Sequence, residues 1–239
     1  MTFDPTQLAV KLFADGADLE EMLEMYGKPY IKGLTTNPTL MRKAGVSNYK
    51  AFARDVLENI RNKPVSFEVF SDDLTEIERQ GLEISSWGEN VFVKIPITNT
   101  KGVSTFPVIE KLVKKQCKIN ITAIMTVTQV ENIVKALNPS IPSYISIFAG
   151  RIADTGRDPE KTIRISLEKI KHLNYCELIW ASPRELLNIF QANSNGCHII
   201  TATKELLDKL PLVGKDLIEY SLDTVKMFRN DAIKSGYTL

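Results

Sequence analysis

The chain has 239 residues, of which 44% are hydrophobic and 25% are charged, and its formal net charge at pH 7 is +1. This composition is typical of a folded globular protein and excludes a disordered, collagen-like or coiled-coil chain. The balanced charge argues against nucleic acid as a partner, because binding to a phosphate backbone needs a basic face that this balance does not supply. An anionic small molecule remains compatible with it.

Three widely spaced cysteines, Cys117, Cys176 and Cys197, occur without a CxxC pair. This pattern indicates neither a disulfide framework nor a zinc site, so we expect buried thiols in a reducing compartment. The N-terminal sequence has no basic segment followed by an apolar stretch, and no window reaches about 18 uncharged apolar residues. We therefore expect a cytoplasmic protein without a membrane segment.

Short apolar runs rich in β-branched residues alternate along the chain with longer segments of helical periodicity. The apolar runs predict strands at 10–14, 30–36, 65–70, 91–97, 119–124, 144–149, 177–181 and 197–201. Between several of them, large apolar residues recur at three- and four-residue steps, which is typical of amphipathic helices. This spacing predicts helices at 48–60, 74–87, 127–137, 158–173 and 183–192.

Strand–helix units that repeat in this way along one chain favour a closed (β/α)8 barrel, the TIM barrel, over an open doubly wound sheet. The sequence lacks the GxGxxG and GxxxxGKS/T fingerprints of nucleotide-binding sheets. It also lacks a linker or fixed repeat that would divide it, so residues 1–239 are expected to form a single barrel domain. Apolar residues at helical steps predict an additional C-terminal helix at about 215–230, and we expect it to allow assembly into a homo-oligomer.

In such a barrel the active site lies at the carboxyl ends of the strands, so polar residues there are candidates for chemistry. Lys94 is the most informative, because it lies in an apolar run and a parallel barrel strand has no wet face. Burial disfavours the ammonium form, and a partly neutral lysine is a nucleophile for carbonyl groups. The structural alternative is a lysine near a strand end whose ammonium extends to water. The other candidates are Asp15, Thr36, Asn37, Glu68, Asn120, Thr122, Ser146, Arg151, Ser182 and Arg184.

Several motifs taken together resemble the transaldolase family, which includes the closely similar fructose-6-phosphate aldolases. They are LTTNPTL (34–40), VSFEVFS (65–71), VFVKIPIT (91–98), NITAI (120–124), SIFAGRIAD (146–154) and WASPR (180–184). The motifs occur in the order and at the spacing of the family, over nearly the whole chain, and the similarity is to its short members. The TTNP turn together with the V-x-V-K-I-P strand is highly specific for this family.

The resemblance implies a class I mechanism without metal or cofactor, in which Lys94 forms a Schiff base with the C2 carbonyl of a ketose phosphate. Asp15 would take the proton of the C4 hydroxyl during cleavage and return it during condensation. Glu68 and Thr122 would hold the water used in carbinolamine formation and dehydration. The sugar phosphate would be bound by Thr36, Asn37 and Asn120 at the three-carbon unit, by Ser146 at substrate hydroxyls, and by Arg151, Ser182 and Arg184 at the terminal phosphate.

Some of these residues also have purely structural interpretations. Arg151 and Arg184 could be surface arginines in solvated ion pairs. The DGADL segment reads as a turn in which Asp18 caps the following helix, so we assign the cap to Asp18 and the acid function to Asp15. Asn37 precedes a proline and is expected to serve both turn geometry and substrate contact.

Two positions bear on the choice between the activities of the family. Transaldolases have glutamate in the third strand and phenylalanine two residues after the sixth-strand serine, where the aldolases tend to have glutamine and tyrosine. This chain has Glu68 and Phe148. Because phenylalanine cannot donate a proton to the enamine, we expect a transferase that passes dihydroxyacetone from fructose 6-phosphate or sedoheptulose 7-phosphate to an aldose phosphate. The resemblance implies a role in the pentose phosphate pathway.

The chain departs from the usual form of the family at Gly16, at Pro183 and at Thr201–Ala202–Thr203, which leaves the donor and the acceptor open. One alternative is an aldolase that releases free dihydroxyacetone, and another is a relative that acts on a modified ketose, for instance a sulfonated one. The non-enzyme alternative is a sugar-phosphate-binding barrel. It is disfavoured, because a binding module has no need for both Lys94 and Asp15.

Overall fold

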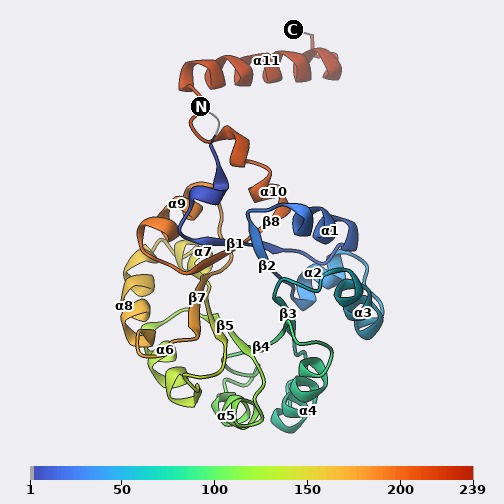
Figure 1. Ribbon diagram of the computed structural model, residues 1–239. Coiled ribbons are helices and arrows are strands. Elements are labelled where there is room, and N and C mark those ends of the chain that lie inside the picture. Colours follow the sequence, from blue (N-terminus) through green and yellow to red (C-terminus); the bar gives the residue numbers. More distant parts are fainter. Residues whose placement is uncertain (1–2, 239) are drawn as a thin grey trace.

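The computed structural model describes residues 3–238 as a closed barrel of parallel strands in sequential order, with helices on its outside (Figure 1). This arrangement confirms the predicted (β/α)8 barrel. The strands are β1 (Lys11–Asp15), β2 (Ile31–Thr35), β3 (Val65–Glu68), β4 (Val91–Pro96), β5 (Ile119–Ile124), β6 (Ser143–Ile147), β7 (Cys176–Trp180) and β8 (Ile199–Thr203).

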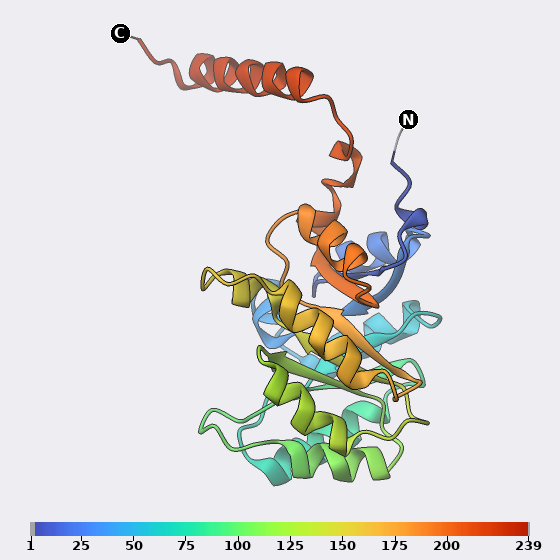
Figure 2. The same ribbon diagram turned by 90° about the vertical axis from the view of Figure 1, so that its left-hand side faces the viewer.

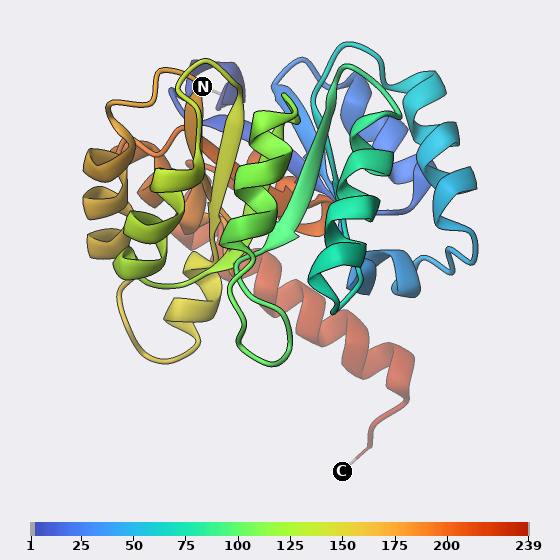
Figure 3. The same cartoon turned by 90° about the horizontal axis from the view of Figure 1, so that it is seen from below.

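Helices follow each strand and surround the barrel (Figure 1), and the view from below shows several of them packed along the outside of the strands (Figure 3). Asp18 caps the first of them by accepting a hydrogen bond from the backbone N–H of Glu21 at 3.0 Å, which confirms the predicted cap. The helices are α1 (Leu19–Gly27), α2 (Pro38–Lys43), α3 (Tyr49–Asn59), α4 (Leu74–Ser85), α5 (Phe106–Lys114), α6 (Val127–Ile133), α7 (Ala149–Ala153), α8 (Glu160–Ile170), α9 (Leu187–Ser194), α10 (Lys204–Leu207) and α11 (Leu217–Ser235).

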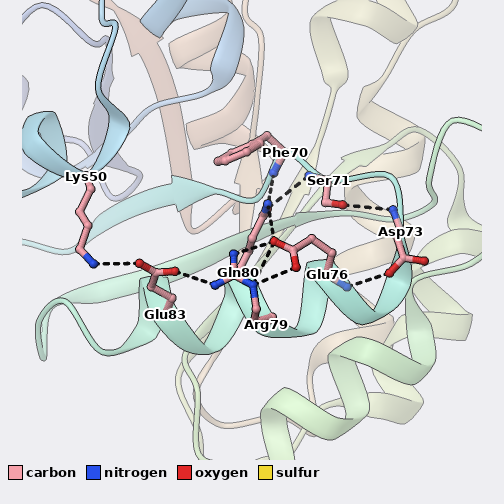
Figure 4. Close-up of polar contacts among 8 residues, drawn as sticks. All are labelled: Lys50, Phe70, Ser71, Asp73, Glu76, Arg79, Gln80 and Glu83. Atoms are coloured by element: carbon pink, nitrogen blue, oxygen red, sulfur yellow. Dashed lines mark hydrogen bonds and ion pairs between the residues drawn. The ribbon is translucent and has the colours of Figure 1, made fainter.

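The third strand is shorter than predicted, because a side chain of the following helix accepts hydrogen bonds from backbone N–H groups just beyond the strand. The apolar run suggested a strand to residue 70, but β3 ends at Glu68. The amide oxygen of Gln80 on α4 accepts hydrogen bonds from the backbone N–H groups of Phe70 (3.0 Å) and Ser71 (3.2 Å), as Figure 4 shows. Val69 still donates its N–H to the Lys94 carbonyl of β4 at 3.0 Å, and the chain then leaves the sheet and turns towards α4.

The eighth strand begins two residues later than predicted, and the C-terminal helix ends later. Cys197 still donates its backbone N–H to Ala192 at the end of α9 (2.9 Å), so pairing in the sheet starts at Ile199. The C-terminal helix α11 is longer than the predicted 215–230 and continues to Ser235, where Gly236 ends it in the left-handed conformation (φ +66°). Figure 2 shows α11 standing apart from the barrel.

The barrel interior is built in two layers by the alternation of side chains along each strand. The lower layer is apolar and consists of Phe13, Phe92, Tyr144, Ile179 and Ile199, whereas Ala181, two residues after Ile179, belongs to the same apolar cluster but lines the cavity. The Tyr144 ring lies at its centre, stacked on Phe92 with centroids 4.1 Å apart and edge-on to Phe13 at 5.8 Å. Two residues further along three of these strands lie Asp15, Lys94 and Ser146, which puts polar side chains directly above the apolar layer.

Two other sequence-based expectations concern cysteines and membrane segments. Cys117, Cys176 and Cys197 are buried free thiols, as predicted. Within residues 3–238, no helix combines the length and the apolar character needed to span a bilayer.

Gly33 on β2 leaves room for the Phe13 ring, which predicts a destabilising effect of Gly33→Ala. A Cβ atom at this position would lie 2.5 Å from Cε2 and 2.7 Å from Cε1 of Phe13, a ring that Tyr144 already confines. Overpacking of this kind typically costs about 1–3 kcal/mol, so we expect the melting temperature in calorimetry to fall by roughly 2–12 °C. Gly27→Ala is the matched control, because no atom lies within 4 Å of a Cβ there. Equal melting temperatures for the two variants would contradict this account.

Candidate active site

A cavity of about 470 Å³ lies at the carboxyl ends of the strands, above the apolar layer. The structure brings all the residues predicted from the sequence to this cavity except Thr36 and Asn120, which are fully buried and do not line it. The predicted residues that line it are Asp15, Asn37, Glu68, Lys94, Thr122, Ser146, Phe148, Arg151, Ser182 and Arg184. Thr35, Thr201 and Thr203 also line it and were not selected from the sequence as site residues.

Lys94 lies at the floor of the cavity with 6% of its surface exposed. Its Nζ atom donates to the backbone carbonyl of Thr36 at 3.0 Å and lies 3.1 Å from a carboxylate oxygen of Glu68. Glu68 is its direct neighbour in the register of β3 and β4. The ammonium is therefore paired inside the barrel, and the alternative that it extends to water is wrong.

Asp15 is held by a chain of hydroxyl groups from the two strands beside β1. The Thr35 hydroxyl on β2 donates to Asp15 Oδ1 at 2.7 Å and lies 2.6 Å from the Thr201 hydroxyl on β8. Because the Thr35 proton points to the carboxylate, Thr201 is the donor in the second contact. These two threonines had no signal in the sequence beyond their places at strand ends, since hydroxyl residues are common there.

The two carboxyl groups at the cavity floor both have raised pKa values. Burial raises the pKa of Asp15 above its ordinary value, against the opposing effects of the Lys94 charge and the Thr35 hydrogen bond. Burial likewise raises the pKa of Glu68, with Lys94 opposing and the Asp15 charge adding to the shift. Each carboxyl group therefore takes up a proton more readily than a solvated one, which suits groups that exchange protons with a substrate.

A second polar chain crosses the barrel beneath the cavity. The Ser146 hydroxyl donates to Asn120 Oδ1 at 2.7 Å, and Asn120 Nδ2 donates to the Ser66 hydroxyl at 3.0 Å. Asn120 is fully buried, so its amide orients Ser146 from below rather than facing the cavity itself. Thr36 contributes its backbone carbonyl to Lys94, while its own hydroxyl has no hydrogen-bond partner among the described residues.

Two residues beside the cavity have positive φ angles that are rare for residues with a side chain. Ala123 (φ 60°) lies where the register of β5 against β6 shifts between Ile121 and Ile124, which is a β-bulge. Ser182 (φ 61°) begins the loop after β7. Such strain is often found at functional sites, and neither residue is a glycine, so the sequence carried no sign of it. Next to the bulge, the buried Thr122 hydroxyl has no hydrogen-bond partner in residues 3–238.

The rim of the cavity carries the two predicted arginines and the turn after β2. Arg184 forms a bidentate ion pair with Asp154, so it lines the cavity and also makes the surface ion pair of the structural alternative. Arg151 lies on α7 and lines the cavity as well. Asn37 caps α2 by accepting from the backbone N–H of Leu40 at 3.0 Å, which confirms its predicted turn role.

No group of three or more histidine, cysteine, aspartate or glutamate side chains in the described part of the chain is placed to hold a metal ion. The cavity instead joins an amine, two carboxyl groups, several hydroxyls and two guanidinium groups. Such a set can form and break bonds to a carbonyl compound and can bind an oxyanion.

A parallel barrel with such a cavity at its carboxyl face has the architecture of the TIM-barrel enzymes. The model of the family described as Transaldolase/Fructose-6-phosphate aldolase matches residues 12–237. A probable transaldolase from Dehalococcoides mccartyi is 31% identical over 218 residues, which cover 90% of this chain and 97% of the relative. One from Herpetosiphon aurantiacus is 30% identical over 90% of this chain and 94% of its own. The chain therefore belongs to the transaldolase/fructose-6-phosphate aldolase family and is an enzyme of the transaldolase/aldolase type.

Solved structures with little sequence similarity share the fold. A dihydrodipicolinate synthase from Rhodopseudomonas palustris superposes with a TM-score of 0.59 over 97% of this chain and 81% of its own, at 13% identity. A putative member of the dihydrodipicolinate synthase family from Coccidioides immitis gives a TM-score of 0.60 over 98% of this chain and 80% of its own, at 11% identity. Identities this low establish the barrel architecture alone.

The raised pKa of Asp15 predicts that Asp15→Asn stabilises the fold at neutral and alkaline pH. A carboxyl group whose pKa is raised by folding binds more protons in the native state, so it lowers stability as the pH rises through that pKa. We expect the asparagine variant to melt roughly 2–4 °C higher at pH 8, equivalent to about 1 kcal/mol, with a smaller gain at pH 5. Differential scanning calorimetry at both pH values measures the difference.

The matched control is Asp55→Asn on the exposed side of α3, which should change stability by less than about 0.5 kcal/mol. A lower melting temperature for Asp15→Asn at pH 8 would show that attraction to Lys94 outweighs the cost of burying the carboxylate.

Proposed function

We propose that the enzyme transfers a dihydroxyacetone unit from fructose 6-phosphate or sedoheptulose 7-phosphate to an aldose phosphate, through a Schiff base on Lys94. The observation that carries this proposal is the buried Lys94 amine at the cavity floor, 3.1 Å from the Glu68 carboxylate. A lysine held in this way can transfer its proton to the adjacent carboxylate and become a nucleophile. The family membership supports the same chemistry.

The first step is the formation of the imine. The neutral Lys94 amine attacks C2 of the ketose, and the carbinolamine then loses water, for which the carbinol oxygen must be protonated. Glu68 is the acid within reach, because its raised pKa allows it to hold a proton and deliver it to the departing water. The unpartnered Thr122 hydroxyl on the neighbouring strand is free to hydrogen-bond that water.

The second step is cleavage of the C3–C4 bond. Asp15 removes the proton from the C4 hydroxyl, the C4 oxygen becomes a carbonyl, and the bonding electrons pass into the iminium to give an enamine. Thr35 holds the Asp15 carboxylate and leaves its second oxygen for the substrate. The aldose leaves, and an acceptor aldehyde then reacts with the enamine by the reverse of these steps, with Asp15 returning the proton.

Phe148 favours transfer over release of free dihydroxyacetone. Its ring packs against the apolar layer of the barrel and lines the cavity, where it offers no proton to the enamine carbon. The enamine therefore persists until an aldehyde arrives. One alternative is an aldolase that releases free dihydroxyacetone. The other is an enzyme that acts on a sulfonated ketose, in which the sulfonate would bind to the same Arg151 and Arg184 guanidinium groups.

We further propose a cytoplasmic homo-oligomer that assembles through α11. The three free thiols fit a reducing compartment. None of the residues of α11 is buried, although Ile218, Leu222 and Val225 form an apolar stripe at helical spacing and are 53–82% exposed. A helix gains most of its stability by burying such a stripe, and a second copy of the chain offers the matching surface.

Substitution on the stripe should dissociate the assembly. We expect size-exclusion chromatography with light scattering to give an oligomer for the natural chain and a lower mass for Leu222→Glu/Val225→Glu, because buried carboxylates at an interface are costly. Asn230→Glu, on the other side of α11, should keep the oligomer. A natural chain with the mass of a monomer would refute this mode of assembly.

Borohydride trapping tests the reaction itself. Incubation with fructose 6-phosphate and borohydride should add a reduced dihydroxyacetone or hexose adduct to the peptide that contains Lys94, located by peptide mass mapping. Lys94→Met should abolish the adduct and lower turnover by more than about 10³-fold, because no other group replaces the covalent intermediate. Lys63→Met, at a partly buried lysine outside the cavity, is the matched control and should retain both.

The products distinguish the activities. Formation of sedoheptulose 7-phosphate only when erythrose 4-phosphate is present indicates transfer, whereas free dihydroxyacetone without an acceptor indicates an aldolase. Absence of any Lys94 adduct with this donor and with other ketose donors would refute the Schiff-base proposal and leave a sugar-phosphate-binding barrel.

A further inference from the structure

Arg184 and Asp154 form an ion pair beside the cavity. Arg184 is among the residues that line the cavity, whereas Asp154 is not. Asp154 accepts from Arg184 Nε at 2.9 Å through one oxygen and from Nη2 through the other. The carboxylate therefore belongs to a residue outside the cavity lining and pairs with Arg184 from there.

The geometry of the pair leaves one edge of the guanidinium free. An arginine has five N–H donors in a fixed plane, and Asp154 uses the edge formed by Nε and Nη2. The edge formed by Nη1 and the second Nη2 hydrogen remains available for a second bidentate contact with an oxyanion. With the first edge fixed, the direction of the second edge is also fixed.

The backbone that carries Arg184 is held as well. Its N–H donates to Asn188 Oδ1 at 2.7 Å. Just before it, the carbonyl oxygen of Ser182 lies so close to Gly150 on α7 that a Cβ atom at Gly150 would fall onto it. Helix α7 and the loop after β7 are thus interlocked at two points, with Gly150 against Ser182 and Asp154 against Arg184.

Arg151, one turn before Asp154 on α7, is not held in this way. Its guanidinium makes no hydrogen bond or ion pair of its own within the described residues, although its charge acts on Asp154. The hydrogen bonds and charge of Arg184, with the charge of Arg151, hold the pKa of Asp154 below its ordinary value, so the carboxylate is ionised at neutral pH. One guanidinium at the cavity rim is thus preset and the other is free to adjust.

We propose that Asp154 is a positioning residue, which presets Arg184 for the terminal oxyanion of the donor sugar and so makes the enzyme selective for phosphorylated over unphosphorylated ketoses. The inference rests on the proposed function in assuming such a donor. A guanidinium that is already held in place loses little side-chain entropy when the oxyanion binds. The affinity is higher because this entropic cost is smaller. The competing account, in which Asp154 occupies Arg184 at the expense of the ligand, predicts the opposite effect of its removal.

Steady-state kinetics with two donors tests the proposal. The donors are fructose 6-phosphate and fructose, each with erythrose as acceptor, so that both give sedoheptulose and only the donor carries or lacks the phosphate. For Asp154→Asn we expect KM for fructose 6-phosphate to rise roughly 5- to 10-fold with kcat within about twofold, while both constants for fructose stay within about twofold. Asp158→Asn is the matched control, because this exposed carboxylate accepts, among residues 3–238, only from the backbone N–H of Glu160.

The outcomes separate positioning from other roles. An unchanged or lower KM for fructose 6-phosphate in Asp154→Asn overturns the proposal. A lower KM would show that Asp154 competes with the ligand for Arg184. An equal rise of KM for both donors also overturns it, because a general structural loss does not distinguish the phosphate. Thermal melting of all variants identifies such a loss directly.

A binding measurement keeps the test independent of the chemistry. Isothermal titration with inorganic phosphate should give a dissociation constant roughly 5- to 10-fold higher for Asp154→Asn than for the natural chain, with Asp158→Asn within about twofold. If the natural chain binds phosphate but turns over neither donor and forms no Lys94 adduct, the proposed function fails while this comparison still decides the role of Asp154. Equal phosphate affinity in Asp154→Asn and the natural chain overturns the proposed positioning role of Asp154.

Discussion

The pairing of the Lys94 ammonium with the Glu68 carboxylate inside the barrel is the interaction on which the rest of the site depends. An isolated charge at this depth would be prohibitively costly, and removal of either partner would leave the other buried and uncompensated. Adjacent strands place the two residues in direct register, so the pair is set by the sheet itself. The Thr36 carbonyl completes the environment of the ammonium. A nucleophile and its proton partner are thereby held together before any substrate is bound.

The second constraint is the layering of the interior. Alternation along the strands puts Asp15 above Phe13 and Lys94 above Phe92, so the same period that packs the aromatic layer also lifts the polar groups to the carboxyl face. The apolar layer fills the barrel beneath the cavity and keeps water from reaching the floor residues from that side. The burial of Asp15 and Glu68 raises their pKa values. Burial of these carboxyl groups therefore lowers the stability of the fold, as is usual where activity requires charged groups away from water.

The rim of the cavity is built from different structural elements than its floor. The floor residues come from strands, which are rigid and mutually registered, whereas the rim comes from the turn after β2 and from two segments that contact each other, α7 and the loop after β7. Contacts between these two segments, Gly150 against Ser182 and Asp154 against Arg184, give the rim an order that loops by themselves lack. Helix α11 lies outside this unit and contributes nothing to the cavity, which makes assembly and catalysis structurally separate.

Local pattern in the sequence was sufficient for the barrel, for Lys94, Asp15 and Glu68 as candidates, and for the caps at Asp18 and Asn37, because period, residue type and turn chemistry act over a few residues. It did not reveal the end of β3 at Glu68, which Gln80 sets from the next helix, nor the bulge at Ala123, which has no glycine to mark it. Likewise, Thr35 and Thr201 became partners of Asp15 only when β2 and β8 closed on β1. The sequence by itself determined which chemical groups stand at the strand ends. Only the tertiary structure decided which of them touch, because those contacts join residues far apart in the chain and depend on closure of the barrel.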